Sequence, residues 1–322
     1  MNMNILTFLI QQMMFFSIPL LIVALGGMFS ERSGVVNIAL EGIMIMGAFT
    51  GVLFIYLVQN AGGGLTGQLL LIVALLIAAV FGAVIALPHG YASIHMKANQ
   101  VISGTAINMF APAFAVYVAR MIRSVQQIPF NNIFWIESVP LLGKIPIIGP
   151  FFFQKTYITT YLGFLILIAA WIVLYKTPFG LRLRSCGEHP QAADSVGINV
   201  YRMRYAGVLI SGALGGIGGL VFVVPTATTF DATVAGYGFL ALAVLIFGQW
   251  KPVKVLLAAF FFGLMKTISV AYTSISFLNS LPIPSAIYKM VPYIATLIVL
   301  AFTSRNSMAP KASGTPYDKG SR

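Results

Sequence analysis

Charged residues are scarce in this chain of 322 residues: only 8% are Asp, Glu, Lys or Arg, whereas 59% are hydrophobic. A soluble domain has about a quarter of its residues charged, so this composition leaves no room for a sizeable water-soluble domain. Cysteine is almost absent as well. Because Cys186 is the single cysteine, no disulfide can form within the chain.

Motifs of catalysis and nucleotide binding are also missing. No GxxxxGK[ST] sequence occurs, and the glycine-rich stretch 62–67 has no lysine, so we expect the chain not to bind ATP itself. His89 and His95 are six residues apart and lack metal-ligand spacing, and no nucleophile–base set can be recognised. We therefore expect no enzyme activity, no cofactor and no metal site in this chain.

Long apolar runs dominate the sequence. They are about 20 residues long, enough to cross about 30 Å of hydrocarbon, whereas a β-barrel would show short alternating segments. The pattern predicts an all-α polytopic membrane protein with about nine spans, within a range of eight to ten. They are Leu6–Met28, Val36–Val58, Gln68–Leu87, Val101–Arg120, Tyr157–Tyr175, Ala206–Pro225, Gly238–Gly248, Val255–Ala271 and Ile287–Thr303.

Three further expectations concern the spans and their connections. The seventh span is short, about 16 Å as a helix, and we interpret it as a half-helix. The connection 123–155 is rich in proline and aromatic residues, and we expect it to form short interfacial helices. The first span has no basic segment before it and no small-residue cleavage site, so no cleavable signal peptide is expected.

The net charge of +12 is explained by topology. Placing the loop 176–205 inside puts thirteen Lys and Arg on that side and five on the other, which predicts an external N-terminus and a cytoplasmic C-terminus. No aromatic–basic stripe points to nucleic acid, so lipid is the expected surrounding. We expect a transmembrane domain over residues 1–303 and a polar, disordered tail over 304–322.

The loop 176–205 is the longest polar segment between spans, and it contains a helix signal. Pro190 suits the first helical position, and Gly197 provides a stop. A helix of about seven residues is not stable alone, so it needs a surface to dock against. The sequence indicates a contact for a soluble partner. The alternative is a solvated basic loop that only fixes topology.

Polar residues within the spans are the candidates for a functional site. Buried charges in hydrocarbon are costly and usually face a cavity or a partner. Glu41 is the strongest candidate, with Asn37 predicted one turn earlier on the same helical face. The others are Ser103, Asn108 and Lys266. Hydrogen bonding between helices, or snorkelling of Lys266, is the alternative, and spacing does not decide whether Glu41 and Lys266 pair.

Glycines in the sixth span follow a second pattern. Gly212 and Gly216 form one GxxxG pair, and Gly215 and Gly219 form another. This spacing lets two helix backbones approach closely, so the pattern predicts helix packing.

Four segments together resemble the permeases of bacterial ABC importers. They are ERSGVVNIALEG at 31–42, NQVISGTAINM at 99–109, the loop TPFGLRLRSCGEHPQAADSVGINVYRMRY at 177–205, and GYGFLALAVLIFGQWKP at 236–252. The chain is most similar to the branch of branched-chain amino acid and ribose permeases, and within it to the nucleoside, simple-sugar-type permeases. The resemblance covers nearly the whole chain except the tail.

The resemblance implies a type II-like importer architecture and a set of partners. These are an ATP-binding subunit, a second permease chain that is a different homologue, and an external substrate-binding lipoprotein. It implies a nucleoside importer, with simple sugars or branched-chain amino acids as alternative cargoes. A stand-alone secondary transporter is the alternative from another class, and it would have no use for the short helix.

The resemblance also assigns roles to individual residues. It implies that the short helix in 176–205 docks onto the ATPase, with the alanines giving close packing. The residues are Glu188, Pro190, Ala192, Ala193, Asp194 and Gly197. The expected pathway residues are Asn37, Glu41, Ser103 and Asn108. Cys186 has no counterpart expected from the family.

Overall fold

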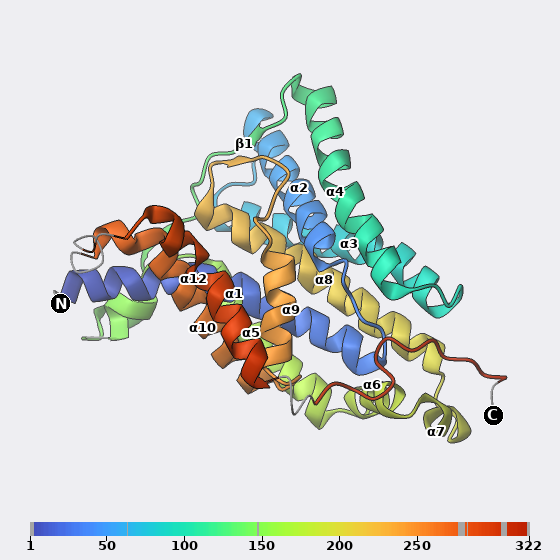
Figure 1. The fold of residues 1–322 in the computed structure, drawn as a ribbon. Coiled ribbons are helices and arrows are strands. Elements are labelled where there is room, and N and C mark those ends of the chain that lie inside the picture. The colour runs from blue at the N-terminus through green and yellow to red at the C-terminus, as the bar shows by residue number, and fades with distance from the viewer. Residues whose placement is uncertain are drawn as a thin grey trace.

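The computed structural model describes residues 3–62, 64–146, 148–275, 281, 283–303 and 308–320, and it is an α-helical bundle (Figure 1). Seven of the described helices are long and apolar enough to cross a membrane. They are α1 (Met3–Ser33), α2 (Leu40–Asn60), α3 (Gly67–Ile94), α4 (Gln100–Arg123), α5 (Ile158–Lys176), α8 (Val200–Thr226) and α10 (Pro252–Ala271). The prediction of an all-α polytopic membrane protein is confirmed.

Two shorter apolar helices complete the membrane part of the described chain. They are α9 (Tyr237–Phe247) and α12 (Ser285–Thr303). The expected half-helix therefore exists as α9. With the seven long helices, the arrangement agrees with a count of about nine, although α9 alone is too short to cross the hydrocarbon.

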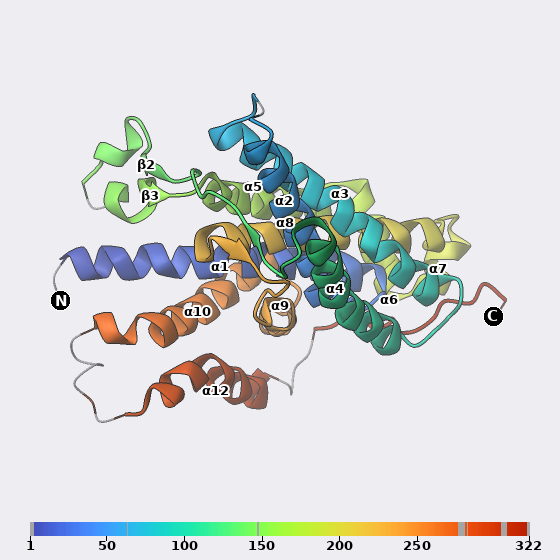
Figure 2. The ribbon, with the colours of Figure 1, turned by 90° about the horizontal axis from the view of Figure 1, so that it is seen from above.

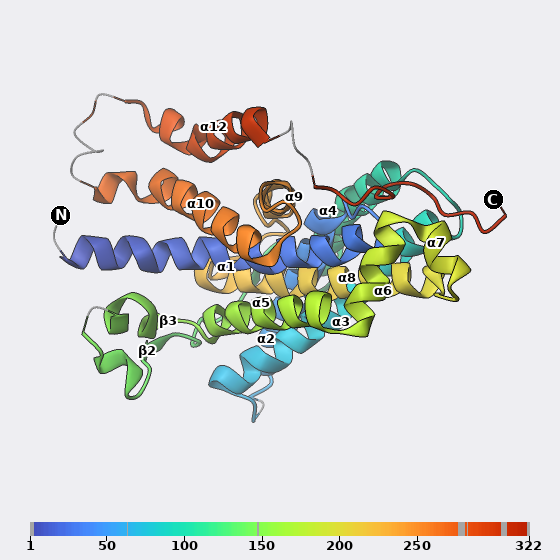
Figure 3. The same cartoon turned by 90° about the horizontal axis from the view of Figure 1, so that it is seen from below.

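Helices α1 and α8 form the centre of the bundle. Their apolar stretches are the most buried of the candidate spans, and α8 packs against α1, α2 and α3 (Figure 2). On the other side, α10 lies beside α1 and α12 lies beside α10 (Figure 3). Helix α4, by contrast, is mostly exposed.

The glycines of α8 allow this close packing. A Cβ atom on Gly216 would overlap the Ala78 carbonyl oxygen of α3, and a Cβ on Gly219 would overlap the Met44 carbonyl oxygen of α2. On the α2 side, Gly47 approaches the backbone of Gly216 equally closely. The interpretation of the two GxxxG pairs as packing motifs is therefore confirmed.

The connection 123–155 differs from the expected interfacial helices. Strand β1 (Ile128–Pro129) pairs antiparallel with β4 (Thr229–Phe230), and β2 (Ile136–Ser138) pairs antiparallel with β3 (Gln154–Thr156). Among the described residues after α4 in this connection, the helical elements are the short turns Leu142–Lys144 and Gly149–Phe153. Prolines spread along this stretch disfavour longer helices, which explains the difference.

The N-terminus lies at one end of the bundle, and α6 (Pro178–Glu188), α7 (Pro190–Ser195) and the C-terminal residues lie at the other (Figure 1). Residues 308–320 are not free in solvent, as the expected disordered tail would be. The Ala312 N–H donates to the Gly187 carbonyl at 2.9 Å, and the Gly314 N–H donates to the Gly34 carbonyl at 3.1 Å. Backbone pairing holds this part of the tail against the bundle.

Candidate functional site

The chain between α1 and α2 leaves the helical conformation over residues 34–39, which are mostly buried. Non-helical backbone in a membrane bundle needs partners inside the protein, because lipid offers no hydrogen bonds. Side chains of α3 and α4 supply them. Gln100 Oε1 accepts from the Val36 N–H at 2.7 Å, and His89 Nε2 lies 2.9 Å from the Val36 carbonyl oxygen. This break is thus braced from two neighbouring helices.

The protonation pattern of His89 follows from these partners. A carbonyl oxygen can only accept, so His89 Nε2 carries the proton that it donates to Val36. His89 Nδ1 lies 2.9 Å from Ser103 Oγ, which can donate to it. Ser103, expected in the pathway, therefore orients a buried histidine in this structure, and its role in transport stays a prediction.

Asn37 lies within the break and not in α2. Its Nδ2 donates to Ser211 Oγ on α8 at 2.8 Å, and its Oδ1 accepts from the Ala39 N–H at 3.2 Å. The prediction that Asn37 and Glu41 share a helical face is wrong, because α2 begins only at Leu40. Asn37 is fully buried, with its amide nitrogen and oxygen both bonded to protein.

Asn108 of α4 caps the start of α2 from outside. Its Oδ1 accepts from the Gly42 N–H at 2.7 Å, and its Nδ2 donates to the Ile38 carbonyl at 2.8 Å. The residue before α2, Ala39, provides no side-chain cap. Asn108 therefore replaces a missing N-cap and links α4 to the break at the same time.

Glu41 of α2 holds the start of α9. One carboxylate oxygen accepts from the Gly236 N–H at 2.9 Å, and the other accepts from the Gly238 N–H at 2.6 Å. Gly236 has a φ of 78°, which a glycine adopts easily. Glu41 does not pair with Lys266: the two salt bridges between described side chains are Arg32–Glu188 and Lys97–Asp318.

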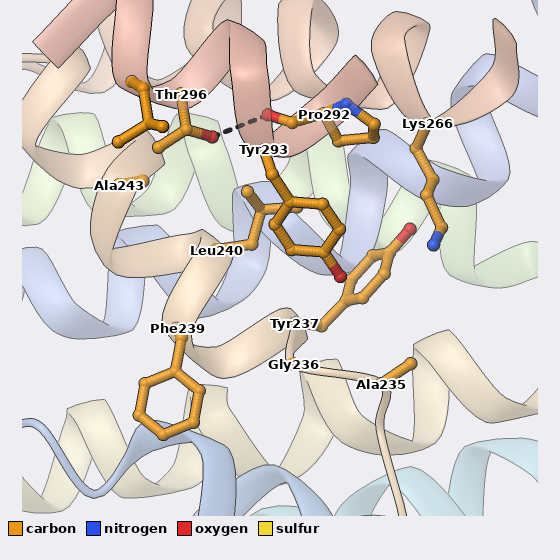
Figure 4. A pocket seen from close by; sticks show the side chains of 11 residues that line it. Ala235, Gly236, Tyr237, Phe239, Leu240, Ala243, Lys266, Pro292, Tyr293 and Thr296 are labelled. Atoms are coloured by element: carbon orange, nitrogen blue, oxygen red, sulfur yellow. Dashed lines mark hydrogen bonds between the residues drawn. The ribbon is translucent and has the colours of Figure 1, made fainter. Parts of the chain in front are cut away.

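Lys266 of α10 lines a pocket of about 400 Å³ between α9, α10 and α12 (Figure 4). Tyr237 of α9 and Tyr293 of α12 line the same pocket. Of the five polar span residues singled out in the sequence, Asn37, Glu41 and Asn108 bond backbone groups, and Ser103 bonds His89. Lys266 is the one of the five that lines this cavity. No group of three or more His, Cys, Asp and Glu able to hold a metal occurs among the described residues.

The predicted short helix exists as α7, with Pro190 in its first turn. Gly197 follows it with a φ of 84°, and its N–H donates to the Asp194 carbonyl at 2.9 Å. The Ile198 N–H reaches back to the Ala193 carbonyl, so the helix ends in a left-handed turn. The expected helix start and stop are confirmed.

The two alanines of α7 face different ways. Ala193 and Pro190 are buried, and Ala193 packs in a cluster with Cys186, Val200 and Tyr317. The implied packing of both alanines against a partner therefore cannot hold, since Ala193 already packs within the chain. The exposed face consists of Gln191, Ala192, Ser195 and Val196.

Glu188 ends α6, a helix that the sequence interpretation did not include. Its carboxylate lies 3.5 Å from Arg32 of α1. Arg32 in turn donates to the Trp250 carbonyl at 3.0 Å, and the Trp250 indole N–H donates to Glu31 at 2.7 Å. The base of α7 is thereby connected to α1 and to the turn between α9 and α10.

Arg204 and the tail complete this end of the molecule. Arg204 of α8 is fully buried, and it donates to the Thr315 carbonyl of the tail at 3.0 Å. Lys97 pairs with Asp318 at 2.8 Å. The loops predicted to share one side of the membrane do lie together, although these contacts do not say which side that is.

Sequence reasoning missed His89, Gln100, Ser211 and Trp250. A single buried histidine or glutamine carries no recognisable pattern, because its partner here is backbone in a distant segment. One available signal was Gly34, which has a φ of 101° and marks the end of α1.

Comparison with known proteins places the chain in a family. The family model "Branched-chain amino acid transport system / permease component" matches residues 9–300. The chain belongs to this family. It is thus a multi-pass membrane permease component of a transport system, and the family resemblance seen in the sequence is confirmed.

The relatives of this permease include three that are named for nucleosides or guanosine. It is 42% identical to the nucleoside ABC transporter permease protein NupC of Lactococcus lactis subsp. cremoris over 98% of both chains, and 43% identical to the guanosine ABC transporter permease protein NupQ of Bacillus subtilis over 99% of both. It is 24% identical to NupB, a second nucleoside permease of the same Lactococcus strain, over 94% of this chain and 84% of NupB. No solved structure matches the permease.

Proposed function

We propose that this permease is the membrane-spanning subunit of an ATP-driven importer of nucleosides. The observation that carries the proposal is the identity of 42% and 43%, over nearly full length, to permeases named for nucleosides and guanosine. ATP is bound and hydrolysed by a separate subunit, and an external lipoprotein delivers the substrate. Simple sugars and branched-chain amino acids are the alternative cargoes.

The end of the molecule that carries α6, α7 and the tail faces the cytoplasm in this proposal. The bias of Lys and Arg toward these loops supports that orientation. The contacts of Arg32, Lys97 and Arg204 support it too, since they gather four of these loops and the tail at one end. The N-terminus then lies outside.

Helix α7 is the contact for the ATPase. Its exposed face offers Ala192, and Val196 at its C-cap is 74% exposed. Arg182 and Arg202 line a groove of about 650 Å³ beside Val196 and Gly197. An apolar contact rimmed by positive charge suits a partner surface with apolar and acidic residues.

Movement of α7 can reach the transport pathway through the contacts described above. Glu188 links the base of α7 to Arg32, and Arg32 links α1 to Trp250 beside α9 and α10. The break at 34–39 and the half-helix α9 are the elements that can reorient when α1 and α10 shift. In the proposal, closure of the ATPase pair moves α7. This movement switches the opening of the pathway from one side of the membrane to the other.

A different homologue provides the second permease chain. The chain is similar to both NupC and NupB, which occur in one Lactococcus strain, and it spans nearly all of NupC but 84% of NupB. The presence of two permeases of different length in one organism supports a heterodimer of this chain with a longer partner.

Uptake of labelled guanosine, adenosine and uridine by cells that express the whole importer tests the proposal. We expect ATP-dependent uptake that survives collapse of the ion gradients, and loss of at least tenfold in Val196→Glu together with loss of ATPase co-purification. Met96→Glu is the matched control, because Met96 is 66% exposed at the same end but lies outside α7. Ala193→Glu is unsuitable, since burying a charge there would unfold the site.

The outcomes separate the parts of the proposal. Uptake that is independent of ATP and driven by an ion gradient would show that the chain is a secondary transporter. ATP-driven uptake of sugars or branched-chain amino acids without nucleoside uptake would replace the cargo and keep the mechanism. Normal coupling in Val196→Glu would refute the role of α7.

A further inference from the structure

The pocket between α9, α10 and α12 has the size and lining of a small-ligand site. Its volume of about 400 Å³ lies within the range of about 300–1,000 Å³ that is usual for ligand pockets. The walls are mainly apolar, with a few polar groups from Tyr237, Lys266, Tyr293 and Thr296 (Figure 4). This combination of apolar walls and few polar groups is typical of pockets that bind small molecules.

Tyr237 carries a buried hydroxyl group without a partner. The side chain is 1% exposed, and its hydroxyl makes no hydrogen bond among the described residues. Buried polar groups in native proteins nearly always have a partner, so an unpaired hydroxyl at a pocket indicates one supplied from outside the chain. In Figure 4 the hydroxyl of Tyr237 and the end of the Lys266 side chain point toward the same part of the pocket.

Lys266 is the one charged side chain among the described residues that line the pocket. It lies within the α10 span and is in neither of the two salt bridges found between described side chains. An ionisable side chain inside a membrane span is a functional candidate by default. An ammonium group has three donors and no acceptor, so a ligand must present acceptor atoms to it.

Tyr293 and Thr296 add a stacking surface and an acceptor. The Tyr293 side chain is 63% exposed, and its ring lines the pocket. The Thr296 hydroxyl donates to the Pro292 carbonyl of its own helix at 2.7 Å, which leaves its oxygen free to accept. A planar base can stack on the tyrosine ring, because every nucleobase has a π-face.

We propose that this pocket binds the base of a nucleoside during transport and prefers 6-oxopurines over 6-aminopurines. The inference rests on the proposed nucleoside cargo. A 6-oxopurine presents two acceptors, O6 and N7, on one edge, which matches the donors of Lys266 and Tyr237. A 6-aminopurine places an amino donor where the oxo group would be, opposite the ammonium group. A zwitterionic amino acid would leave its ammonium group without a carboxylate in this lining.

Glu41 holds one wall of the pocket in place. Gly236 lines the pocket and is the residue whose N–H the Glu41 carboxylate accepts. Glu41 therefore acts as a positioning residue that fixes where α9, and with it Tyr237, sits. Its carboxylate bonds backbone N–H groups, and the contacts with the base are made by Lys266 and Tyr237.

The test is the maximal rate of uptake by the whole importer at saturating guanosine and at saturating adenosine. Saturation removes the affinity of the external lipoprotein from the comparison. In the wild type we expect the rate for guanosine to exceed that for adenosine. In Lys266→Met we expect the guanosine rate to fall at least tenfold and the ratio of the two rates to approach one.

Two further variants keep the test independent of folding. Tyr237→Phe removes only the hydroxyl group, and we expect a loss of about threefold to tenfold in the guanosine rate, on the scale of one neutral hydrogen bond. Lys266→Arg keeps the charge and donors, and we expect it to retain discrimination between the two purines. Lys289→Met is the control, because Lys289 is an exposed lysine on α12 outside the pocket.

Each result has one meaning when the variants reach the membrane and keep the basal ATPase rate of the complex. Guanosine rates and ratios unchanged in both Lys266→Met and Tyr237→Phe, with normal wild-type uptake, would overturn the pocket assignment alone. Absence of nucleoside uptake in the wild type would overturn the proposed cargo, and the pocket assignment with it.

Discussion

The carboxylate of Glu41 accepts a hydrogen bond from the backbone N–H of Gly238 at 2.6 Å, and this contact joins two elements that are far apart in sequence. It resolves a physical problem of the fold. Helix α9 has 11 residues and begins inside the bundle, where its first N–H groups have no partner within the helix. A negative charge at that position satisfies these groups and favours the positive end of the helix dipole.

Replacing Glu41 should therefore destabilise α9. We expect Glu41→Gln to cost about 0.5–2 kcal/mol, the range for loss of a good cap, and Glu41→Ala to cost more because no acceptor remains. The melting temperature of the purified complex, followed by tryptophan fluorescence, measures the effect. Glu137→Gln is the control, since Glu137 is an exposed residue of β2. Equal melting temperatures for Glu41→Ala and wild type would contradict the capping role.

Asn108 allows a similar test of the break between α1 and α2. Asn108→Leu would leave the Gly42 N–H and the Ile38 carbonyl without partners, and each buried unpaired group costs about 1–3 kcal/mol. Asn108→Asp keeps the acceptor for Gly42, so it should cost less. Thr105→Val on the same helix is the control, because the exposed Thr105 hydroxyl donates to the Val101 carbonyl of its own helix. If Asn108→Leu and Thr105→Val melt alike, Asn108 does not brace the break.

The packing of α8 gives a third prediction. A methyl group at Gly216 would overlap the carbonyl oxygen of Ala78 on α3, so Gly216→Ala must push α3 away from α8. We expect a loss of about 1–3 kcal/mol or failure to assemble, as for other overpacked cores. Gly64→Ala has no neighbouring atom in its way and should be neutral. The fraction of monodisperse complex after detergent extraction compares the two variants, and a Gly216→Ala complex as stable as wild type would refute close contact.

Much of the membrane fold could be predicted from composition and spacing. Runs of apolar residues predict spans because lipid forces the backbone to bond within each helix. Helices α1, α3 and α4 contain the stretches expected for them, and α2 and α5 contain most of theirs. Pro190 and Gly197 predicted α7 for an equally local reason, since a proline favours the start of a helix and a glycine in the left-handed conformation ends one. The packing role of the GxxxG pairs of α8 could be predicted because residues four positions apart lie on the same face of a helix.

The interior partnerships could not be predicted in the same way. Asn37 was assigned to a helix because its neighbours are apolar, but the chain turns at Gly34 and α2 begins only at Leu40. Glu41 bonds Gly236 and Gly238, which are nearly 200 residues away, and no spacing rule connects such positions. The tail was expected to be disordered for its polar composition, yet its backbone pairs with Gly34 and Gly187.

The rate at which the Cys186 thiol is alkylated indicates whether the tail covers it. Burial raises the pKa of its thiol to about 11, against the weaker opposite effect of Arg204. The thiolate is the reactive form, so at pH 8 only roughly one thiol in a thousand is reactive, and alkylation should speed up as pH rises toward 11. Tyr317 belongs to the buried cluster that contains Cys186. Tyr317→Ala should therefore expose the thiol, lower its pKa and accelerate labelling by N-ethylmaleimide at least tenfold.

Mass spectrometry of the intact purified complex, sampled over time at pH 7, 8 and 9, measures this labelling. Asp318→Asn is the matched control. It breaks an exposed pair with Lys97, a type of contact that contributes less than about 1 kcal/mol, and leaves Tyr317 in place. Labelling in this variant should stay as slow as in wild type. Fast labelling of the wild type at pH 7, at the rate of Tyr317→Ala, would show that the tail does not cover Cys186. That result would also contradict the attachment of the tail to α6 and α8, because the pairings of residues 312–315 with Gly187, Gly34 and Arg204 hold the chain next to Tyr317 in place.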